Sequence, residues 1–227
     1  MKHGSVNGFI HTFPRWKRTM DIVFSGAGII VALPLFLLIA GIIKITSPGP
    51  ALLRQERIGR FGKPFLFWKF RTMRSDADAS SHEAHLRNLI ATNTPMVKLD
   101  AKSDPRVFPF GRILRSTCLD ELPQLINVLR GDMSLVGPRP CMAYEFQQYQ
   151  DWQKRRFDAM PGITGLWQVS GKNKTTFTEM IGLDIAYVER VSFMEDLRII
   201  FKTIPAILSD LAENAGRKDM TQVKRAA

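Results

Sequence analysis

The feature that most constrains this chain is a run of 22 residues without a charged side chain, from Ile22 to Ile43. As a helix with a rise of about 1.5 Å per residue, the run is about 33 Å long, and the hydrocarbon core of a bilayer is about 30 Å thick. A cleaved signal peptide fits poorly, because the run is too long and no small-residue cleavage site follows it before the next basic segment. We therefore expect these residues to associate with a membrane.

Pro34 lies near the middle of this apolar segment, where a proline removes one backbone hydrogen bond and kinks a helix. Basic side chains flank both ends, at positions 2, 15, 17 and 18 before the segment and 44, 54, 57, 60 and 63 after it. A spanning helix should carry more lysine and arginine on its cytoplasmic side than on the other. This symmetry favours a re-entrant hairpin that enters one leaflet, breaks at Pro34 and returns to the same face. A kinked spanning helix and a buried core helix are the alternatives.

The chain is strongly basic, with 32 lysine and arginine residues against 21 acidic ones and a formal net charge of +11. Such a charge favours polyanionic partners, which include nucleic acid, anionic lipid headgroups and phosphorylated substrates. Cys118 and Cys141 have no CxxC spacing, so we expect no disulfide framework and a reducing compartment. The four histidines form no zinc motif, and the sequence contains no GxxxxGKS or GxxxxGKT motif for a Walker-type ATP site.

Residue periodicity predicts a mostly helical α/β chain of the α+β type. We expect a lead-in over 1–21, a membrane segment over 22–45, one domain over 46–211 and a polar tail over 212–227. We expect a β-hairpin over 51–73, a short strand within 161–173, and helices near 81–90, near 117–130, within 141–160, over 177–190 and over 193–211. The polar stretch 74–103 is either a solvated connector or a mobile flap over the site. The apolar stripe of 193–211, which Pro205 interrupts, either packs on the domain or lies on the bilayer as an interfacial amphipathic helix.

Asp120 and Glu121 are adjacent carboxylates at the predicted start of the 117–130 helix. The helix dipole favours acidic residues in a first turn, and a Thr-x-x-Asp spacing resembles a capping box, so the pair alone has a structural explanation. Its surroundings favour function, because Gln124 and Asn127 continue a polar face and arginines flank the helix. Paired carboxylates near arginines are typical of sites that bind Mg²⁺ and phosphate oxygens.

Four cations are candidates for phosphate binding. Arg139 lies between two prolines, which restrict its backbone and present the guanidinium at little entropic cost. Lys69 and Arg71 alternate with aromatic residues in WKFRTM and would share one face of a strand by its period of two. Arg115 precedes the carboxylate pair. A rigid surface loop around Arg139 and a solvated strand face are the structural alternatives.

Four segments together resemble the bacterial sugar transferases, the monotopic phosphoglycosyl transferases. They are RFGKPFLFWKFRTM, DPRVFPFGRILR, LDELPQLINVLRGDMSLVGPRP and PGITGLWQVSGKN, and the resemblance extends from about Arg15 to Leu208. It implies transfer of a sugar-1-phosphate from a UDP-sugar to a polyprenyl phosphate, such as undecaprenyl phosphate, at the cytoplasmic face of the bacterial inner membrane. It further implies that Asp120 attacks the β-phosphorus and releases UMP, and that Glu121 helps Asp120 to hold Mg²⁺ or manages the proton.

The resemblance also bears on the membrane segment and on the partners. Family members have a re-entrant hairpin that breaks at a central proline, commonly after a serine, whereas this chain has Leu33 before Pro34. Residues 46–211 would form the cytosolic catalytic domain, with a UDP-sugar, polyprenyl phosphate and membrane lipid as partners and with no nucleic acid. A homodimer is a guess that no motif supports. The segment PGITGLWQVSGKN looks more like members that transfer glucose or galactose phosphate than like those for N-acetylated sugars.

Two further residues complete the set of substrate-binding candidates, Gln168 in the glycine-rich segment and Asp184 in the predicted helix over 177–190. Two alternative functions stay open. A membrane-anchored basic binding module would explain the charge and the anchor, but it gives no reason for the carboxylate pair near Arg139. A transferase that moves the phosphosugar directly to the lipid, with Asp120 only binding Mg²⁺, would share every motif.

Overall fold

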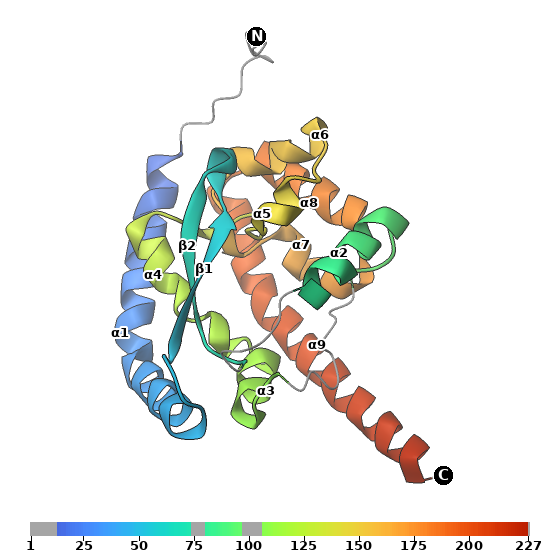
Figure 1. The fold of residues 1–227 in the computed structure, drawn as a ribbon. Coiled ribbons are helices and arrows are strands. Elements are labelled where there is room, and N and C mark those ends of the chain that lie inside the picture. The colour runs from blue at the N-terminus through green and yellow to red at the C-terminus, as the bar shows by residue number, and fades with distance from the viewer. Residues whose placement is uncertain (1–12, 74–79, 97–105, 227) are drawn as a thin grey trace.

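The computed structural model of the chain describes residues 13–73, 80–96 and 106–226 (Figure 1). Within these ranges the chain is mostly helical, and its strands form two separate two-stranded sheets. Helix α1 (Arg15–Thr46) lies along one edge of the domain, and the end of helix α9 (Phe193–Ala226) projects on the opposite side (Figure 1). The predicted α+β class, mostly helical, is confirmed, and the structure has one long apolar N-terminal helix where a re-entrant hairpin is predicted.

The predicted hairpin is present as β1 (Leu52–Ile58) and β2 (Pro64–Phe70). The strands are antiparallel, and their register pairs Leu52 with Phe70 and Ile58 with Pro64. The short 3-10 turn η1 (Arg60–Gly62) reverses the chain, with Gly62 at a φ of 71°. Positive φ is readily available to glycine, which explains why the turn forms there.

A second, smaller sheet joins two segments that lie far apart in the sequence. Strand β3 (Ser134–Val136), which the sequence pattern did not predict, pairs in parallel with the predicted strand β4 (Gly162–Thr164). Gly137 follows β3 directly, and a Cβ added there would lie 2.1 Å from the carbonyl oxygen of Met160. Only glycine permits this backbone approach, which brings the loop of Arg139 against the glycine-rich segment.

The prediction of one helix over 117–130 is wrong at its N-terminal end. Helix α3 (Pro109–Ser116) is followed by the 3-10 turn η2 (Leu119–Glu121) and then by α4 (Gln124–Arg130). Cys118 has a φ of 58°, so the chain changes direction immediately after Thr117. The Thr117 hydroxyl donates to the carbonyl of Ile113 at 2.8 Å, so Thr117 belongs to the end of α3 and not to the start of the next helix.

The polar face of α4 points into the protein rather than toward solvent. Gln124 and Asn127 are 1% and 0% exposed. The Asn127 amide donates to the carbonyl of Leu66 at 2.7 Å, and its oxygen accepts from the backbone N–H of Trp68 at 3.0 Å. Asn127 therefore attaches α4 to the edge of β2, and the carboxylate pair stands outside this buried contact.

The other predicted helices are confirmed with one exception. Helix α2 (Ser80–Thr92) buries Leu86 and Leu89, so the described part of 74–103 is packed and is not a solvated connector, while 74–79 and 97–103 lie outside the described residues. The single helix expected within 141–160 is instead α5 (Ala143–Phe146), α6 (Asp151–Lys154) and the 3-10 turn η3 (Arg155–Asp158). The short elements α7 (Leu166–Val169) and η4 (Lys172–Lys174) lead into the predicted helix α8 (Phe177–Glu189).

Both ends of α1 attach to the same domain. Near its start, the buried Lys17 amine donates to the Val136 carbonyl at 2.9 Å and pairs with Asp196 of α9. Near its end, Ile39 and Ile43 are buried in a cluster with Phe70, Phe108 and Leu114. Between these attachments the outward face is apolar and exposed, at Val23, Phe24, Ile30, Val31, Leu37 and Leu38. This exposure disfavours the buried core helix.

The chain continues as helix through Pro34, so the break expected there is not seen in α1. The helix curves toward its C-terminal end (Figure 1). Proline in a helix interior lacks the N–H of one hydrogen bond, which is a usual cause of such bending.

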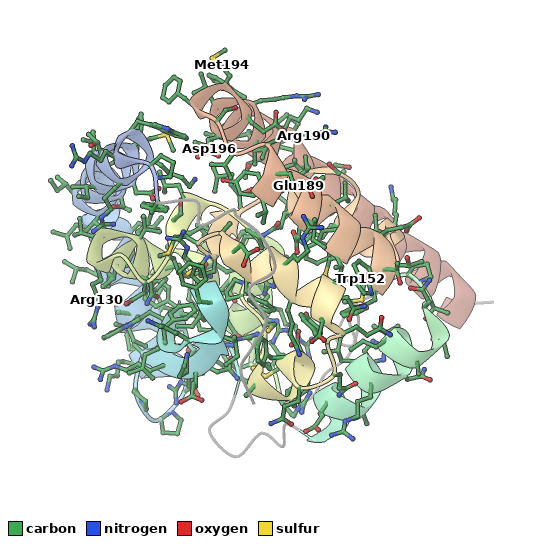
Figure 2. All side chains as sticks on the ribbon, turned by 90° about the horizontal axis from the view of Figure 1, so that it is seen from above. Arg130, Trp152, Glu189, Arg190, Met194 and Asp196 are labelled. Carbon is green, nitrogen blue, oxygen red and sulfur yellow. The ribbon has the colours of Figure 1, made fainter. Side chains whose placement is uncertain are left out.

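The apolar stripe of α9 is divided between packing and exposure. Figure 2 shows Asp196 on the side of α9 that faces α1, whereas Met194 projects outward and is 69% exposed. Ile199 is fully buried one turn later, but the stripe residues Phe201, Ile204 and Leu208 are between 60% and 68% exposed. The first part of α9 therefore packs on the domain, and an apolar side remains uncovered farther along the helix.

Candidate active site

The carboxylate pair lies on η2, next to the apolar helix α1. The residues on either side of the pair, Leu119 and Leu122, pack against the cluster that contains Ile39 and Ile43 of α1. Asp120 and Glu121 themselves are partly exposed. The polar turn η2, with an apolar residue on each side of the pair, thus places the two carboxylates beside the C-terminal part of α1.

Four cations from four different elements interact electrostatically with this turn or with one another. Lys69 lies near the end of β2, Arg115 near the end of α3, Arg139 in the loop after β3, and Arg57 on β1. Burial, together with the charges of Arg57, Arg115 and Arg139, lowers the pKa of Lys69 to about 8, while the charge of Asp120 opposes the shift. Lys69 and Arg139 are thus within electrostatic reach of Asp120, and Arg57 and Arg115 are within reach of Lys69; we refer to these four side chains as the cation cluster.

Arg139 contacts the carboxylate pair directly. Its guanidinium donates to the Glu121 carboxylate at 3.2 Å. The negative charge of Glu121 raises the pKa of Arg139, despite the opposing effect of burial. The guanidinium is therefore held in its charged form beside the two acids.

Two residues of this cluster were missed in the sequence. Glu145 on α5 is a carboxylate whose pKa is raised by burial, against the opposing charges of Arg57, Arg156 and Arg139. Arg57 has its pKa lowered by burial and by Arg139. The pairing of the hairpin strands could have indicated that Arg57 shares a face with Lys69. Leu53 pairs with Lys69, and Arg57 lies four residues after Leu53, on the same side of β1. No local motif points to Glu145.

Three predicted site residues do not join the cluster. The Arg71 guanidinium is buried and donates to the carbonyls of Pro48 and Ser47 just after α1, rather than sharing a phosphate-facing side with Lys69. Asp184 is 1% exposed and pairs with Arg156 at 2.6 Å; burial raises its pKa to about 6, and the Arg156 charge opposes this shift.

Gln168 is the third of these residues and lies on α7. Both polar atoms of its side-chain amide are buried and have no hydrogen-bond partner within the described part of the chain. A buried primary amide without partners is unusual, because such groups normally form at least one hydrogen bond. Gln168 therefore stays a candidate for ligand binding.

The cluster can neutralise several phosphate oxygens at once. Its cations, Arg57, Lys69, Arg115 and Arg139, lie within electrostatic reach of one another or of three carboxylates, Asp120, Glu121 and Glu145. Arginine offers paired donors that match phosphate oxygens, and partial burial strengthens these interactions relative to water. A carboxylate held among such cations is suited to react with, or to bind a metal for, a diphosphate.

Comparison with known proteins agrees with this geometry. The family described as "Bacterial sugar transferase" matches residues 12–210. The exopolysaccharide production protein ExoY of Sinorhizobium fredii (strain NBRC 101917 / NGR234) is 39% identical over 191 residues, which cover 84% of each chain.

Two other relatives have names that describe a reaction. An undecaprenyl-phosphate galactose phosphotransferase of Salmonella typhimurium is 42% identical, over 85% of this chain and 42% of that protein. A UDP-glucose:undecaprenyl-phosphate glucose-1-phosphate transferase of Caulobacter vibrioides is 42% identical, over 85% of this chain and 70% of that protein. This chain therefore spans most of some relatives and less than half of others. With a family match over almost its whole length, the chain belongs to the bacterial sugar transferase family.

Proposed function

We propose that this protein transfers a sugar-1-phosphate from a UDP-sugar to a polyprenyl phosphate, through a covalent intermediate on Asp120. The observation that carries the proposal is the position of the carboxylate pair, between a cluster of four cations and the apolar helix α1. The cations suit a diphosphate, and α1 suits a lipid. The relatives named as undecaprenyl-phosphate phosphotransferases support the same pair of substrates.

In the first step, a carboxylate oxygen of Asp120 attacks the β-phosphorus of the UDP-sugar. The bond between this phosphorus and the bridging oxygen breaks, and UMP leaves with that oxygen. In the second step, a phosphate oxygen of the polyprenyl phosphate attacks the same phosphorus, and Asp120 is released as a carboxylate. Anionic phosphate oxygens repel a carboxylate nucleophile, so Lys69, Arg115 and Arg139 must reduce this repulsion in both steps.

The residues present fit a Mg²⁺ ion that is shared with the substrate. Among the described residues no group of three or more metal-ligating side chains is found, but Asp120 and Glu121 provide two adjacent carboxylates. Mg²⁺ commonly binds through one or two carboxylates together with substrate phosphates, and when bound it neutralises the phosphate charge. Glu121 would hold it on one side while still accepting from Arg139.

We further propose that α1 is inserted from one side of the membrane, as a hairpin bent around Pro34, with the catalytic domain on the cytoplasmic face of the bacterial inner membrane. Attachment of both ends of α1 to one domain supports entry from one side, because a helix across the bilayer would need the domain that holds both of its ends to lie within the bilayer. The basic residues on both sides of the apolar segment support the cytoplasmic face.

The decisive experiment is to trap the intermediate. Purified protein in detergent is incubated with a UDP-sugar that is radiolabelled in the sugar, without lipid acceptor. We expect label on a peptide that contains Asp120, stoichiometric UMP release, and transfer of the label when polyprenyl phosphate is added. Turnover without any adduct would refute the covalent mechanism and favour direct transfer.

Asp120→Asn distinguishes an enzyme from a binding module. The variant should keep its thermal unfolding transition and its attachment to vesicles, but it should lose UMP release. A wild-type protein that binds anionic vesicles and releases no UMP with any UDP-sugar would favour the binding module. We propose glucose or galactose as the transferred sugar, and UMP release across a panel of UDP-sugars tests this choice.

A further inference from the structure

The loop that carries Arg139 is held by contacts to its backbone. The Gly137 N–H donates to the carbonyl of Thr164 at 2.8 Å, and the carbonyl of Pro138 accepts from the Gly162 N–H at 2.9 Å. On the other side of Arg139, the carbonyl of Cys141 accepts from the N–H of Ile58 at 2.9 Å. The two prolines have no N–H to donate, so the carbonyl oxygen of Arg139 is a further point at which the loop can be held.

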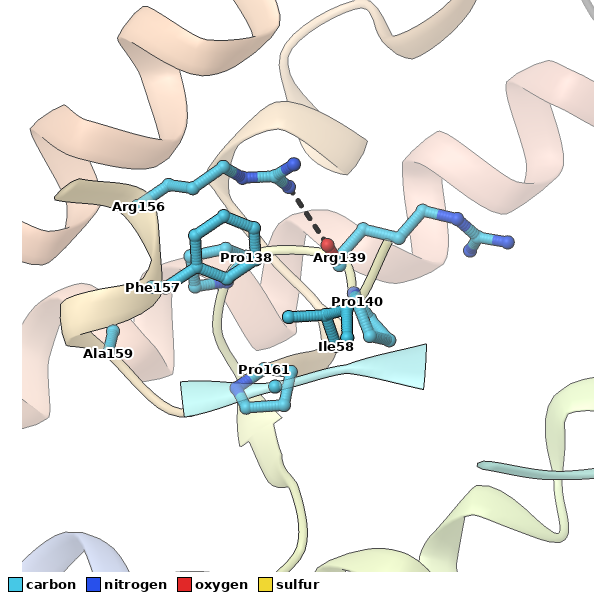
Figure 3. A pocket seen from close by; sticks show the side chains of 9 residues that line it. Ile58, Pro138, Arg139, Pro140, Arg156, Phe157, Ala159 and Pro161 are labelled. Atoms are coloured by element: carbon cyan, nitrogen blue, oxygen red, sulfur yellow. Dashed lines mark hydrogen bonds between the residues drawn. The ribbon is translucent and has the colours of Figure 1, made fainter. Parts of the chain in front are cut away.

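This carbonyl is bound by a second, buried arginine. The Arg156 guanidinium donates to the carbonyl oxygen of Arg139 at 2.8 Å (Figure 3). Figure 3 also shows that the Arg139 side chain extends away from Arg156, so the two guanidinium groups lie on different sides of the loop. Arg156 thus contacts the backbone of the site residue, and its charge also acts on Glu145.

Arg156 is enclosed on all sides. It is 2% exposed and pairs with Asp184 of α8 at 2.6 Å. Another nitrogen of the same guanidinium donates to the Tyr149 hydroxyl at 2.7 Å. The guanidinium carbon also lies 5.6 Å and 5.4 Å from the ring centres of Tyr149 and Phe157. One planar group therefore connects α8, the segment after α5 and the loop of Arg139.

Stability alone is a weak explanation for such an arrangement. Removing two charges from water is costly, and well-packed apolar residues often replace a buried ion pair without loss of stability. What an apolar group cannot provide is several donors in fixed directions. The rigid fork of arginine binds a carboxylate, a hydroxyl and a carbonyl at once, and the single ammonium of lysine does not reproduce that geometry.

We propose that Arg156 and Asp184 are positioning residues. They hold the backbone of Arg139 so that its guanidinium is placed to bind the diphosphate of the UDP-sugar. Asp184, a substrate-binding candidate by sequence, then acts through Arg156 and touches no substrate. This inference rests on the proposed function, because it assigns a task to Arg139 in nucleotide-sugar binding.

A double-mutant cycle tests the coupling. Arg156→Lys is introduced into the wild-type protein and into Arg139→Ala, and two quantities are measured for all four proteins in detergent: the Kd for UDP with Mg²⁺, and kcat/KM for UMP release. In the wild-type background we expect Arg156→Lys to weaken UDP binding and to lower kcat/KM about tenfold, since small displacements of a binding group are costly. In the Arg139→Ala background the same change should alter both by less than about twofold.

The neighbouring ion pair provides a matched control. Arg155 and Glu189 connect the same two elements, η3 and α8, at 2.7 Å, but both side chains are more than half exposed. Arg155→Lys should leave the Kd for UDP and kcat/KM unchanged in both backgrounds. If Arg156→Lys does not fold, as judged by its thermal transition, Asp184→Asn takes its place in the cycle, because the amide has nearly the same shape as the carboxylate and removes the charge that pairs with Arg156.

The outcomes separate this inference from the function it rests on. Equal losses in the two backgrounds, or no loss in the wild-type background, would overturn the positioning role even if wild-type protein releases UMP. Wild-type protein that binds UDP but releases no UMP would overturn the proposed reaction, and the Kd cycle would still decide whether Arg156 acts through Arg139.

Discussion

Lys69 should make the enzyme sensitive to pH in the weakly alkaline range. Burial, together with Arg57, Arg115 and Arg139, lowers the pKa of this lysine to about 8. A lysine carries its charge below its pKa, so its contribution to phosphate binding is present at neutral pH and is lost as the pH rises through 8. The dependence of kcat/KM on pH reports groups of the free enzyme, where no substrate phosphate raises the pKa again.

The size of the effect follows from the titration of one group. With a pKa of about 8, roughly 90% of Lys69 is charged at pH 7 and roughly 10% at pH 9. If only the charged form binds the diphosphate productively, kcat/KM should fall about tenfold between these pH values. An arginine at this position stays charged throughout, so Lys69→Arg should remove the decline near pH 8 even if its activity at pH 7 is lower.

The assay is UMP release at UDP-sugar concentrations well below KM, in buffers of constant ionic strength from pH 6 to 10, with a thermal melt at each pH. Lys63→Arg is the control, because Lys63 is an exposed lysine just before β2 of the same hairpin. It should leave the profile unchanged. A wild-type profile that stays flat to pH 10, or the same decline in Lys69→Arg, would refute the assignment to Lys69.

Three further predictions follow from the contacts around the site. Asn127→Leu removes two buried hydrogen bonds to the backbone of Leu66 and Trp68. The free energy of unfolding should fall by about 2 kcal/mol and the Tm by about 4–8 °C, and an unchanged Tm would contradict this prediction. Gly137→Ala would place a Cβ 2.1 Å from the Met160 carbonyl oxygen; we expect no cooperative melt, and native-like melting would disprove the tight approach. EDTA should abolish UMP release without lowering the Tm; full turnover in EDTA would exclude an essential Mg²⁺.

Sequence patterns predicted the elements whose residues interact locally. The hairpin of β1 and β2, the helix α8 and the long apolar helix α1 follow from periodicity and turn residues within short windows. The helix before Arg130 was misplaced because its start depends on one residue, Cys118, in a left-handed conformation. Asparagine, aspartate and glycine commonly adopt positive φ, and cysteine gives no such signal.

The candidate site was predicted in part, for a similar reason. Asp120, Glu121 and Arg139 stood in motifs, and the structure brings them together with Lys69 and Arg115. Arg71, by contrast, is used in a backbone contact just after α1. The sequence offered no means to distinguish a lysine of the cation cluster from an arginine two residues later that binds carbonyls.

By itself, the sequence of this protein determined a basic, membrane-associated chain with a carboxylate pair, a proline-flanked arginine and the motifs of one transferase family. The tertiary structure decided which charges meet. Arg57 and Glu145 join the site, while Asp184 pairs with Arg156 behind the loop of Arg139. The physical reason is that helix and strand periods are local, whereas a buried ion pair is selected by the packing of elements tens of residues apart, where each charge must find a partner to balance its lost hydration.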